Sequence, residues 1–176
     1  MPGADDGLGK KAEGLIKTWL DQPDQGYSFD RIPDQMSGYY KVSRNICDFI
    51  CFKSPNIYYI ESKATWKDRF DFSMITETQS EGLHEKNKIE HAYALVMVLF
   101  ASQQRAFIFN IDDIRYLEKR GIKSLNIKKI DNWPIKYVEV ETEKDNRKTY
   151  LNYTEDLTWL PVKLGVLFLQ KAEKND

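Results

Sequence analysis

The segment of residues 46–64 constrains the fold most strongly, because two runs rich in Ile, Phe and Tyr flank a short polar stretch there. That stretch, residues 53–56, contains Pro55 and Asn56, and a polar segment of this kind between apolar runs predicts a turn. The segment therefore predicts a β-hairpin in which Phe52 pairs with Ile57 across a four-residue loop.

This register also fixes the positions of three charged residues. Asp48 is expected directly opposite Glu61, and Ile46 opposite Lys63. Because side chains alternate along a strand, Asp48, Glu61 and Lys63 are expected on one face of the hairpin. Directly opposed Cβ atoms lie about 4.5–5.5 Å apart, and like charges at that distance are destabilising. The two acids therefore need a positive partner.

Two interpretations of the acids stay open at this point. Mg²⁺ binds one or two carboxylates together with water and phosphate oxygens, so the acids suit a metal site with Lys63 beside it. The alternative is a surface salt bridge between Lys63 and either acid, worth about 0–1 kcal/mol. The apolar setting favours the metal site, because the first strand is expected to be buried on both faces and a buried carboxylate needs a partner. In that strand we expect Ile46, Ile50 and Phe52 on the Asp48 face and Cys47, Phe49 and Cys51 on the other.

Length and composition indicate one globular domain. The chain has 176 residues, 41% apolar and 30% charged, which is typical of a soluble protein with a full core. We expect a single domain over residues 1–176, with a core at about 5–120 and an extension, a hairpin and a helix, at about 122–176. No apolar run reaches the length of a membrane span and no leader is visible, so we expect a cytoplasmic protein that does not enter membranes.

Cysteine content and charge exclude some classes of function. Cys47 and Cys51 are expected as buried thiols on one strand face, where a disulfide is geometrically implausible. Net charge is −1, so the protein is not a general nucleic-acid coat. Six basic residues between positions 115 and 129, against one acid, and a second group around the hairpin either track a phosphate backbone or form solvated faces. No Gly-rich phosphate loop, CxxC pair or Ser/His/Asp triad is evident, and we expect no organic cofactor.

The remaining elements follow from periodicity and capping patterns. Helices are expected at residues 5–20, from near 76 to 91, and at 112–120 with Gly121 as C-terminal cap. Strands are expected at residues 27–32, 93–100 and 105–109, a further hairpin from 135–141 and 148–153, and an ordered loop at 65–74. The apolar stretch 157–169 predicts a helix that covers a sheet face or a partner subunit. Together these elements predict an α/β fold with a central mixed sheet flanked by helices.

Several residues on these elements are candidates for function, each with a structural alternative. Glu13 either forms a solvent-side pair with Lys17 or faces the hairpin site. Gln79 either reaches back to the helix N-cap or points into the site. His84 and His91 are expected on one helix as ordinary residues. In the connection at residues 33–43 and just after it, Tyr39, Tyr40, Lys41 and Arg44 either bind nucleic acid by stacking and charge or pack the loop down.

The pattern Asp48-x12-Glu61-x-Lys63 resembles the active site of the PD-(D/E)XK nuclease superfamily, although Cys47 replaces its leading Pro. Within that superfamily the chain looks most like RecU-type Holliday-junction resolvases from about residue 8 to 115. The matching segments are residues 9–16, 43–48, 61–65 and 79–83, the last ahead of the apolar run 93–100. Two departures are Gly82, where the family commonly has His, and the absence of a long projecting stalk beyond a short counterpart at residues 33–44.

The resemblance implies a restriction-endonuclease-like core and a Mg²⁺-dependent DNA endonuclease, with Mn²⁺ as a substitute metal. It implies metal binding by Glu13, Asp48 and Glu61 with help from the Ser62 carbonyl. Lys63 would act on the attacking water and the phosphate, and Gln79 would border the site. Lys67 and Arg69 join the candidate DNA contacts. A homodimer is the natural expectation, because cutting a junction symmetrically requires two sites.

The leading interpretation is a structure-selective nuclease acting on branched DNA, with a Holliday-junction resolvase in recombination and repair as the specific expectation. Two alternatives stay open: a restriction or repair nuclease on linear duplex, and a non-catalytic DNA-binding module with a nuclease-like fold.

Overall fold

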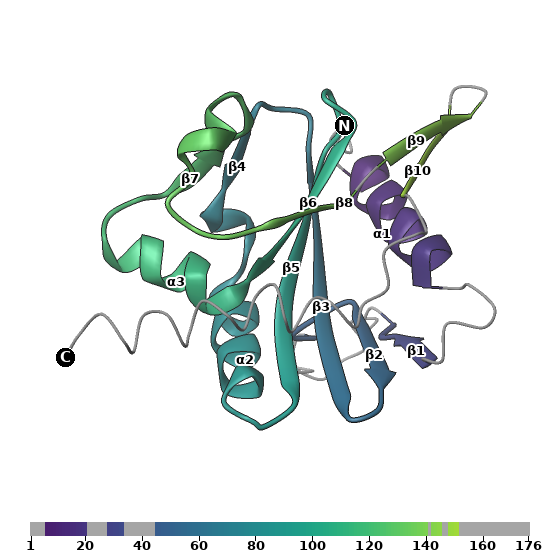
Figure 1. The fold of residues 1–176 in the computed structure, drawn as a ribbon, viewed down its shortest axis with the longest axis vertical. Helices are drawn as coiled ribbons and strands as arrows, with labels where there is room; N and C mark the ends of the chain where they lie inside the picture. The colour runs from purple at the N-terminus through teal and green to yellow at the C-terminus, as the bar shows by residue number, and fades with distance from the viewer. Residues whose placement is uncertain (1–5, 21–27, 34–44, 141, 146–147, 152–176) are drawn as a thin grey trace, which may run out of the picture.

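The computed structural model describes residues 6–20, 28–33, 45–140, 142–145 and 148–151. A six-stranded sheet forms its centre, in the order β1-β2-β3-β5-β6-β8 (Figure 1). The strands are β1 (Ser28–Arg31), β2 (Phe49–Lys53), β3 (Asn56–Thr65), β5 (Ala92–Phe100), β6 (Arg105–Asn110) and β8 (Val138–Val140). β3 and β5 run parallel and all other neighbours antiparallel, so the sheet is mixed. The expected α/β fold class is confirmed.

Three helices and two small sheets surround the central sheet. The helices are α1 (Asp6–Leu20), α2 (Glu77–Asn87) and α3 (Ile111–Lys119). β4 (Arg69–Asp71) pairs with β7 (Ser124–Asn126), and β9 (Thr142–Asp145) pairs with β10 (Lys148–Leu151). Two short 3-10 helices, η1 (Phe72–Met74) and η2 (Ile127–Asn132), follow β4 and β7. In the described part of the chain no helix is long and apolar enough to cross a membrane.

The two faces of the sheet have separate cores. On one face Leu8, Ala12 and Ile16 of α1 pack against a cluster that includes Tyr58 and Ile60 of β3. The helical spacing of these α1 residues explains the amphipathic pattern in the sequence. On the other face lie α2 and α3, so the helices divide between the two sides of the sheet (Figure 1).

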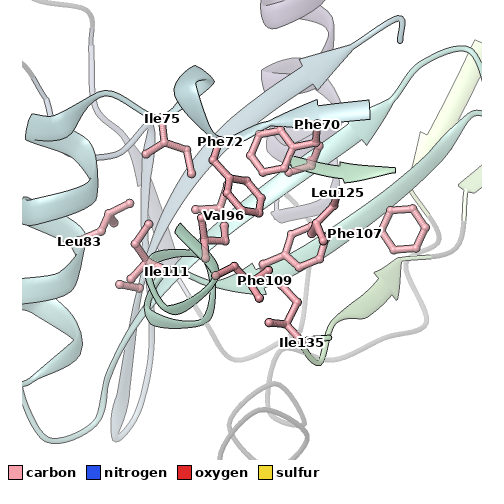
Figure 2. Packing of buried hydrophobic residues seen from close by; sticks show 14 of the residues in the cluster. Phe70, Phe72, Ile75, Leu83, Val96, Phe107, Phe109, Ile111, Leu125 and Ile135 are labelled. Carbon is pink, nitrogen blue, oxygen red and sulfur yellow. The ribbon is translucent and has the colours of Figure 1, made fainter. Parts of the chain in front are cut away.

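The core beneath α2 and α3 is rich in aromatic residues. Figure 2 shows Leu83 of α2 and Ile111 of α3 in one layer with Phe72, Val96 and Phe109. All five are at most 1% exposed. Aromatic residues dominate core energetics because each buries a large area, and the layer therefore fixes α2 against the sheet.

The predicted hairpin register is confirmed. Phe52 pairs with Ile57 and Phe49 with Ile60, as the sequence predicts. The loop is shorter than expected, because Lys53 pairs with Asn56 and only Ser54 and Pro55 remain in the turn.

Burial of the first hairpin strand differs from the prediction. Phe52 is 51% exposed, so this strand is not buried on both faces. Cys47 and Cys51 are buried free thiols, as expected, but belong to different core clusters. The reason is that β2 begins only at Phe49, so the two-residue alternation does not extend back to Cys47.

Two predicted connections were wrong. Within the predicted loop 65–74, residues 69–74 form β4 and η1, because Phe70 and Phe72 are buried core residues. The C-terminal hairpin also pairs differently: β8 adds to β6 in the central sheet, and β10 pairs with β9. The segment 157–169 lies outside the described residues.

α2 begins as the capping pattern predicts and ends earlier than expected. Thr76 is its N-cap and forms a capping box with Gln79. The helix ends at Asn87, and His91 lies after it with φ of 61°. The expectation that His84 and His91 share a helix was therefore wrong. Gly121 follows α3 with φ of 79°, the left-handed conformation of a glycine at a helix end, as predicted.

Gly82 explains how closely α2 approaches the chain before β2. A Cβ atom at position 82 would lie 2.3 Å from Ile46 Cγ2 and 2.9 Å from Ile46 Cβ. Such distances are shorter than any van der Waals contact, so only glycine fits without displacement. The position where RecU-type sequences commonly have His is thus a packing position in this chain.

We expect Gly82→Ala to lower the free energy of unfolding by about 1–3 kcal/mol, because the added methyl group overpacks the contact with Ile46. Urea denaturation of the purified variant measures this. Gly9→Ala is the matched control, because Gly9 lies in α1 and a Cβ atom there meets nothing within 4 Å. This change should raise the free energy of unfolding by about 0.5–1 kcal/mol. Equal effects at the two positions would contradict the packing argument.

Candidate active site

The carboxylate of Glu61 is the most unusual charged group in the described chain. It lies in β3, is 2% exposed, and is one of three buried polar or charged residues. Burial and, to a smaller extent, the nearby charge of Asp48 together raise the pKa of Glu61 to about 7, although Lys63 and Gln79 oppose both effects. A carboxylate in this environment is costly to ionise without a cationic partner.

The two oxygens of Glu61 differ in their contacts. Oε1 lies 2.6 Å from Lys63 Nζ and accepts a 2.6 Å hydrogen bond from Gln79 Nε2. Oε2 is buried and has no hydrogen-bond partner among the described residues. Since buried polar atoms are nearly always satisfied, an unpartnered carboxylate oxygen is a candidate ligand atom.

Asp48 is fixed at the point where the hairpin ladder ends. Its N–H donates to the Ile60 carbonyl at 3.0 Å, and its own carbonyl accepts from the Ile32 N–H at 2.8 Å. Its side-chain Oδ2 accepts a 2.7 Å hydrogen bond from the Ser62 N–H. The carboxylate thus takes the place of a backbone acceptor beside β3. This bond places Asp48 next to Glu61, as the predicted register requires.

Gln79 serves both roles that its sequence context suggested. Its Oε1 accepts from the Thr76 N–H at 3.1 Å in the capping box and from Lys63 Nζ at 3.2 Å. Its Nε2 donates to Glu61. The same amide therefore caps α2 and binds two site residues. The N-terminal end of α2, which carries a partial positive charge, is thereby held beside an anionic group.

Cys47 does not contribute a thiolate to the site. Burial, together with the nearby charges of Glu61 and Asp48, raises the pKa of its thiol to about 12. A thiol with this pKa is neutral at physiological pH, and only the thiolate is a good metal ligand. Cys47 is therefore a packing residue.

Glu13 does not join the two acids in the structure. It lies on α1, on the other side of the sheet, and accepts a 3.0 Å hydrogen bond from Arg31 Nε in an ion pair. Among the described residues no three His, Cys, Asp or Glu side chains gather as a metal-binding group. The sequence correctly predicted the helix that carries Glu13. It did not predict that Glu13 pairs with Arg31, because nothing in the pattern of β1 indicates this ion pair.

The other predicted residues fall into two groups. Lys67 and Arg69 follow β3 in space and sequence, and Arg69 is paired with Asp71 at 2.8 Å. Tyr39, Tyr40, Lys41 and Arg44 lie outside the described residues. Thr76, near which the sequence predicted the start of the helix, fixes the orientation of Gln79 through the capping box.

The donor set fits a hard divalent cation. Asp48 and Glu61 supply carboxylate oxygens, which Mg²⁺ prefers, and Glu61 Oε2 is buried and unpartnered. The two acids lie close together, because Asp48 Oδ2 accepts a 2.7 Å hydrogen bond from the N–H of Ser62, the residue after Glu61. A cation between them would remove the cost of ionising Glu61 in this buried position.

Comparison with known families identifies the chain. The model of the family described as "Recombination protein U", RecU, matches residues 25–156, which is most of the sequence. The chain belongs to the RecU family. The resemblance to PD-(D/E)XK nucleases that the sequence suggested is thereby confirmed, and the Asp48–Glu61–Lys63 pattern lies within the part that RecU matches.

The RecU match extends beyond the resemblance noted in the sequence, which ended near residue 115. No curated protein matches the chain. Among solved structures, the chain is similar to Hjc, a Holliday junction resolvase from the archaeal hyperthermophile Archaeoglobus fulgidus. The identity is 15% over 59% of this chain and 78% of that chain, with a TM-score of 0.43.

The raised pKa of Glu61 predicts a pH-dependent stability. Since the native pKa of Glu61, about 7, exceeds the usual glutamate pKa of 4.5, native Glu61 holds its proton more tightly than the unfolded chain does. This contribution to stability is fully present below about pH 4.5 and is lost as pH rises through 7. The loss is about 3 kcal/mol. In buffer that contains a metal chelator, the free energy of unfolding of Glu61→Gln relative to wild type should therefore increase between pH 5 and 8.

Urea denaturation at several pH values measures this difference. Glu81→Gln is the control, because Glu81 is exposed on α2 and its curve should run parallel to wild type. Parallel curves for wild type and Glu61→Gln would show that Glu61 does not titrate in this range.

Proposed function

We propose that this protein is a divalent-metal-dependent endonuclease that hydrolyses phosphodiester bonds in branched DNA and resolves four-way junctions. Membership of the RecU family supports the recombination setting. The observation that carries the chemistry is the buried Glu61, whose Oε1 is held by Lys63 and Gln79 while Oε2 has no partner in the described chain.

In this proposal Asp48 and Glu61 hold the metal, with Oε2 of Glu61 and the Ser62 carbonyl as further ligand atoms. A bound Mg²⁺ or Mn²⁺ would polarise the scissile phosphate and lower the pKa of the attacking water. Ser62 also holds Asp48 in place through its N–H, so one residue of β3 both orients a ligand and supplies one. Glu13, which is paired with Arg31 on the other face, has no direct role in this arrangement.

Lys63 acts on the water and on the phosphate. Its ammonium lies 2.6 Å from Glu61 Oε1 and 3.2 Å from Gln79 Oε1, so two acceptors fix its position. A cation fixed in this way stabilises charge that develops on the phosphate without reorganisation during the reaction. Gln79 is a positioning residue, because it orients Lys63 and Glu61 together from the end of α2.

The DNA is expected to extend from this site over nearby basic residues. Lys67 and Arg69 lie just beyond β3, and Tyr39, Tyr40, Lys41 and Arg44 remain candidates for further contacts. Because symmetric cleavage of a junction requires two sites, we propose a C₂ homodimer in which each protomer supplies one. We propose that it acts in the cytoplasm.

We expect Lys63→Ala and Asp48→Asn to bind four-way junctions but to cut them about 10²–10³-fold more slowly with Mg²⁺. Asn at position 48 still accepts the hydrogen bond from Ser62, so loss of cutting reports on the charge rather than on the fold. Gel-based cleavage and binding of a labelled junction measure both quantities. Lys88→Ala, at the far end of α2, removes an exposed lysine and should cut normally. Undiminished cutting by both site variants would refute the proposal.

The same assay separates junction resolution from cleavage of linear duplex. A four-way junction and a linear duplex carrying the same sequence at the cut position are compared with wild-type protein. Preferential cutting of the junction is expected. Equal or faster cutting of the linear duplex would instead indicate a restriction or repair nuclease.

Metal binding is also expected to stabilise the fold without any DNA. Mg²⁺ or Mn²⁺ at 100 times its Kd would add about 2.7 kcal/mol if it binds only the folded protein. The unfolding temperature of wild type should therefore rise with metal, and that of Asp48→Asn should rise much less. If wild type neither gains stability nor cuts any DNA with metal, the chain is a non-catalytic DNA-binding module.

A further inference from the structure

Trp66 is exposed in a segment whose other aromatic residues are buried. Phe70 and Phe72 are at most 1% exposed, whereas Trp66, one residue after the end of β3, is 54% exposed. An indole is among the side chains that gain most from burial. Its exposure beside the candidate active site therefore needs an explanation.

The bend that carries Trp66 is fixed on both sides by hydrogen bonds. On one side Thr65 Oγ1 accepts from the Lys67 N–H at 3.0 Å, and the Thr65 carbonyl accepts from the Ala101 N–H at 2.9 Å. On the other side the Asp68 carbonyl accepts from the Ile127 N–H at 2.8 Å. The exposed indole is thus presented by an ordered backbone, which lowers the entropy cost of binding a partner.

The charges around this bend suit an anionic partner. Asp68 and Asp71, the first two acids after Trp66 in the chain, are paired with Lys128 at 2.6 Å and with Arg69 at 2.8 Å, respectively. Lys67 follows Trp66 directly, and the two residues line one cavity, which is described below. A phosphate backbone that passes here meets neutralised acids and a lysine.

A cavity of about 290 Å³ lies beside the indole. Its lining residues come from the end of β3, the bend and η1: Ala64, Thr65, Trp66, Lys67, Asp71, Ser73 and Met74. The lining combines apolar surface with hydroxyl, carboxylate and ammonium groups. This combination fits a flat heteroaromatic ring with polar edges, such as a nucleobase.

The position of Trp66 relative to Lys63 limits which base it reaches. Three residues of extended chain span about 10 Å. Successive nucleotides rise about 3.4 Å along a strand, so this span corresponds to about three nucleotides. A base that stacks on Trp66 therefore lies within about three nucleotides of a phosphate bound at Lys63.

We propose that Trp66 is a DNA-binding residue that stacks on the exposed face of a nucleobase at the branch point, close to the cut phosphate, and that it contributes to the preference for branched DNA. This inference rests on the proposed function. Paired bases inside a duplex have both faces covered by their neighbours, whereas a branch point exposes a face. Aromatic side chains bind such bases independently of sequence.

Binding of a four-way junction, a linear duplex and a single strand in metal-free buffer tests the inference with the full-length protein. Trp66→Ala should weaken junction binding about 5- to 150-fold, the range expected for loss of one stacked base. Trp66→Phe should bind within about 3-fold of wild type, because a ring remains. Binding of the linear duplex should change little. Phe52→Ala is the control: Phe52 is equally exposed but lies at the turn end of the hairpin, and its removal should leave binding unchanged.

A second readout tests stacking itself. 2-Aminopurine placed singly at each of about three positions on either side of the cut changes its fluorescence when a ring stacks on it. One position should change with wild type and Trp66→Phe but not with Trp66→Ala. No such position, or equal weakening of junction and linear duplex by Trp66→Ala, would overturn the inference. If wild type binds and cuts junctions while Trp66→Ala binds them equally well, only this inference fails. If wild type neither binds nor cuts junctions, the proposed function fails.

Discussion

The structure of the site depends on keeping an ionisable carboxylate, Glu61, buried next to a second one. Groups from two elements, β3 and α2, meet the cost of that arrangement. Lys63 comes from the same strand, Gln79 from α2, and Asp48 is held at the end of the hairpin ladder by the Ser62 N–H. Because each group also has a structural role in its own element, the geometry of the site and the local fold determine one another.

Helix α2 links this site to the core. Its N-terminus is fixed by Thr76 and Gln79, and Leu83 packs into the aromatic layer in Figure 2. Gly82 allows the helix to approach Ile46, two residues before Asp48. A shift of α2 would therefore move Gln79 away from Glu61 and press on the segment that carries Asp48. Packing at a glycine thus controls the distance between the capping amide and the acids.

What the sequence predicted well were features set by neighbours along the chain. The hairpin register followed from a short turn between apolar runs, and the capping box followed from residues 76–79. The wrong predictions depended on packing between distant segments. Phe70 and Phe72 were predicted to lie in a loop, because the residues that they contact on β5, β6 and β7 are remote in sequence. The pairing of Glu13 with Arg31 was not predicted for the same reason, because periodicity predicts a helix but not the face of the sheet that the helix covers.

The energetics of Glu61 connect stability with metal binding. Without a cation, ionisation of Glu61 is opposed by burial and by Asp48, so its pKa lies near 7 rather than near 4.5. A divalent cation that binds both carboxylates favours their charged forms, and the free energy lost in the metal-free protein is recovered as affinity for the metal. Lys63 limits this loss but holds only one oxygen of Glu61, and the second oxygen stays without a protein partner in the described chain. The same feature that reduces stability above pH 7 is therefore what favours binding of a cation at this position.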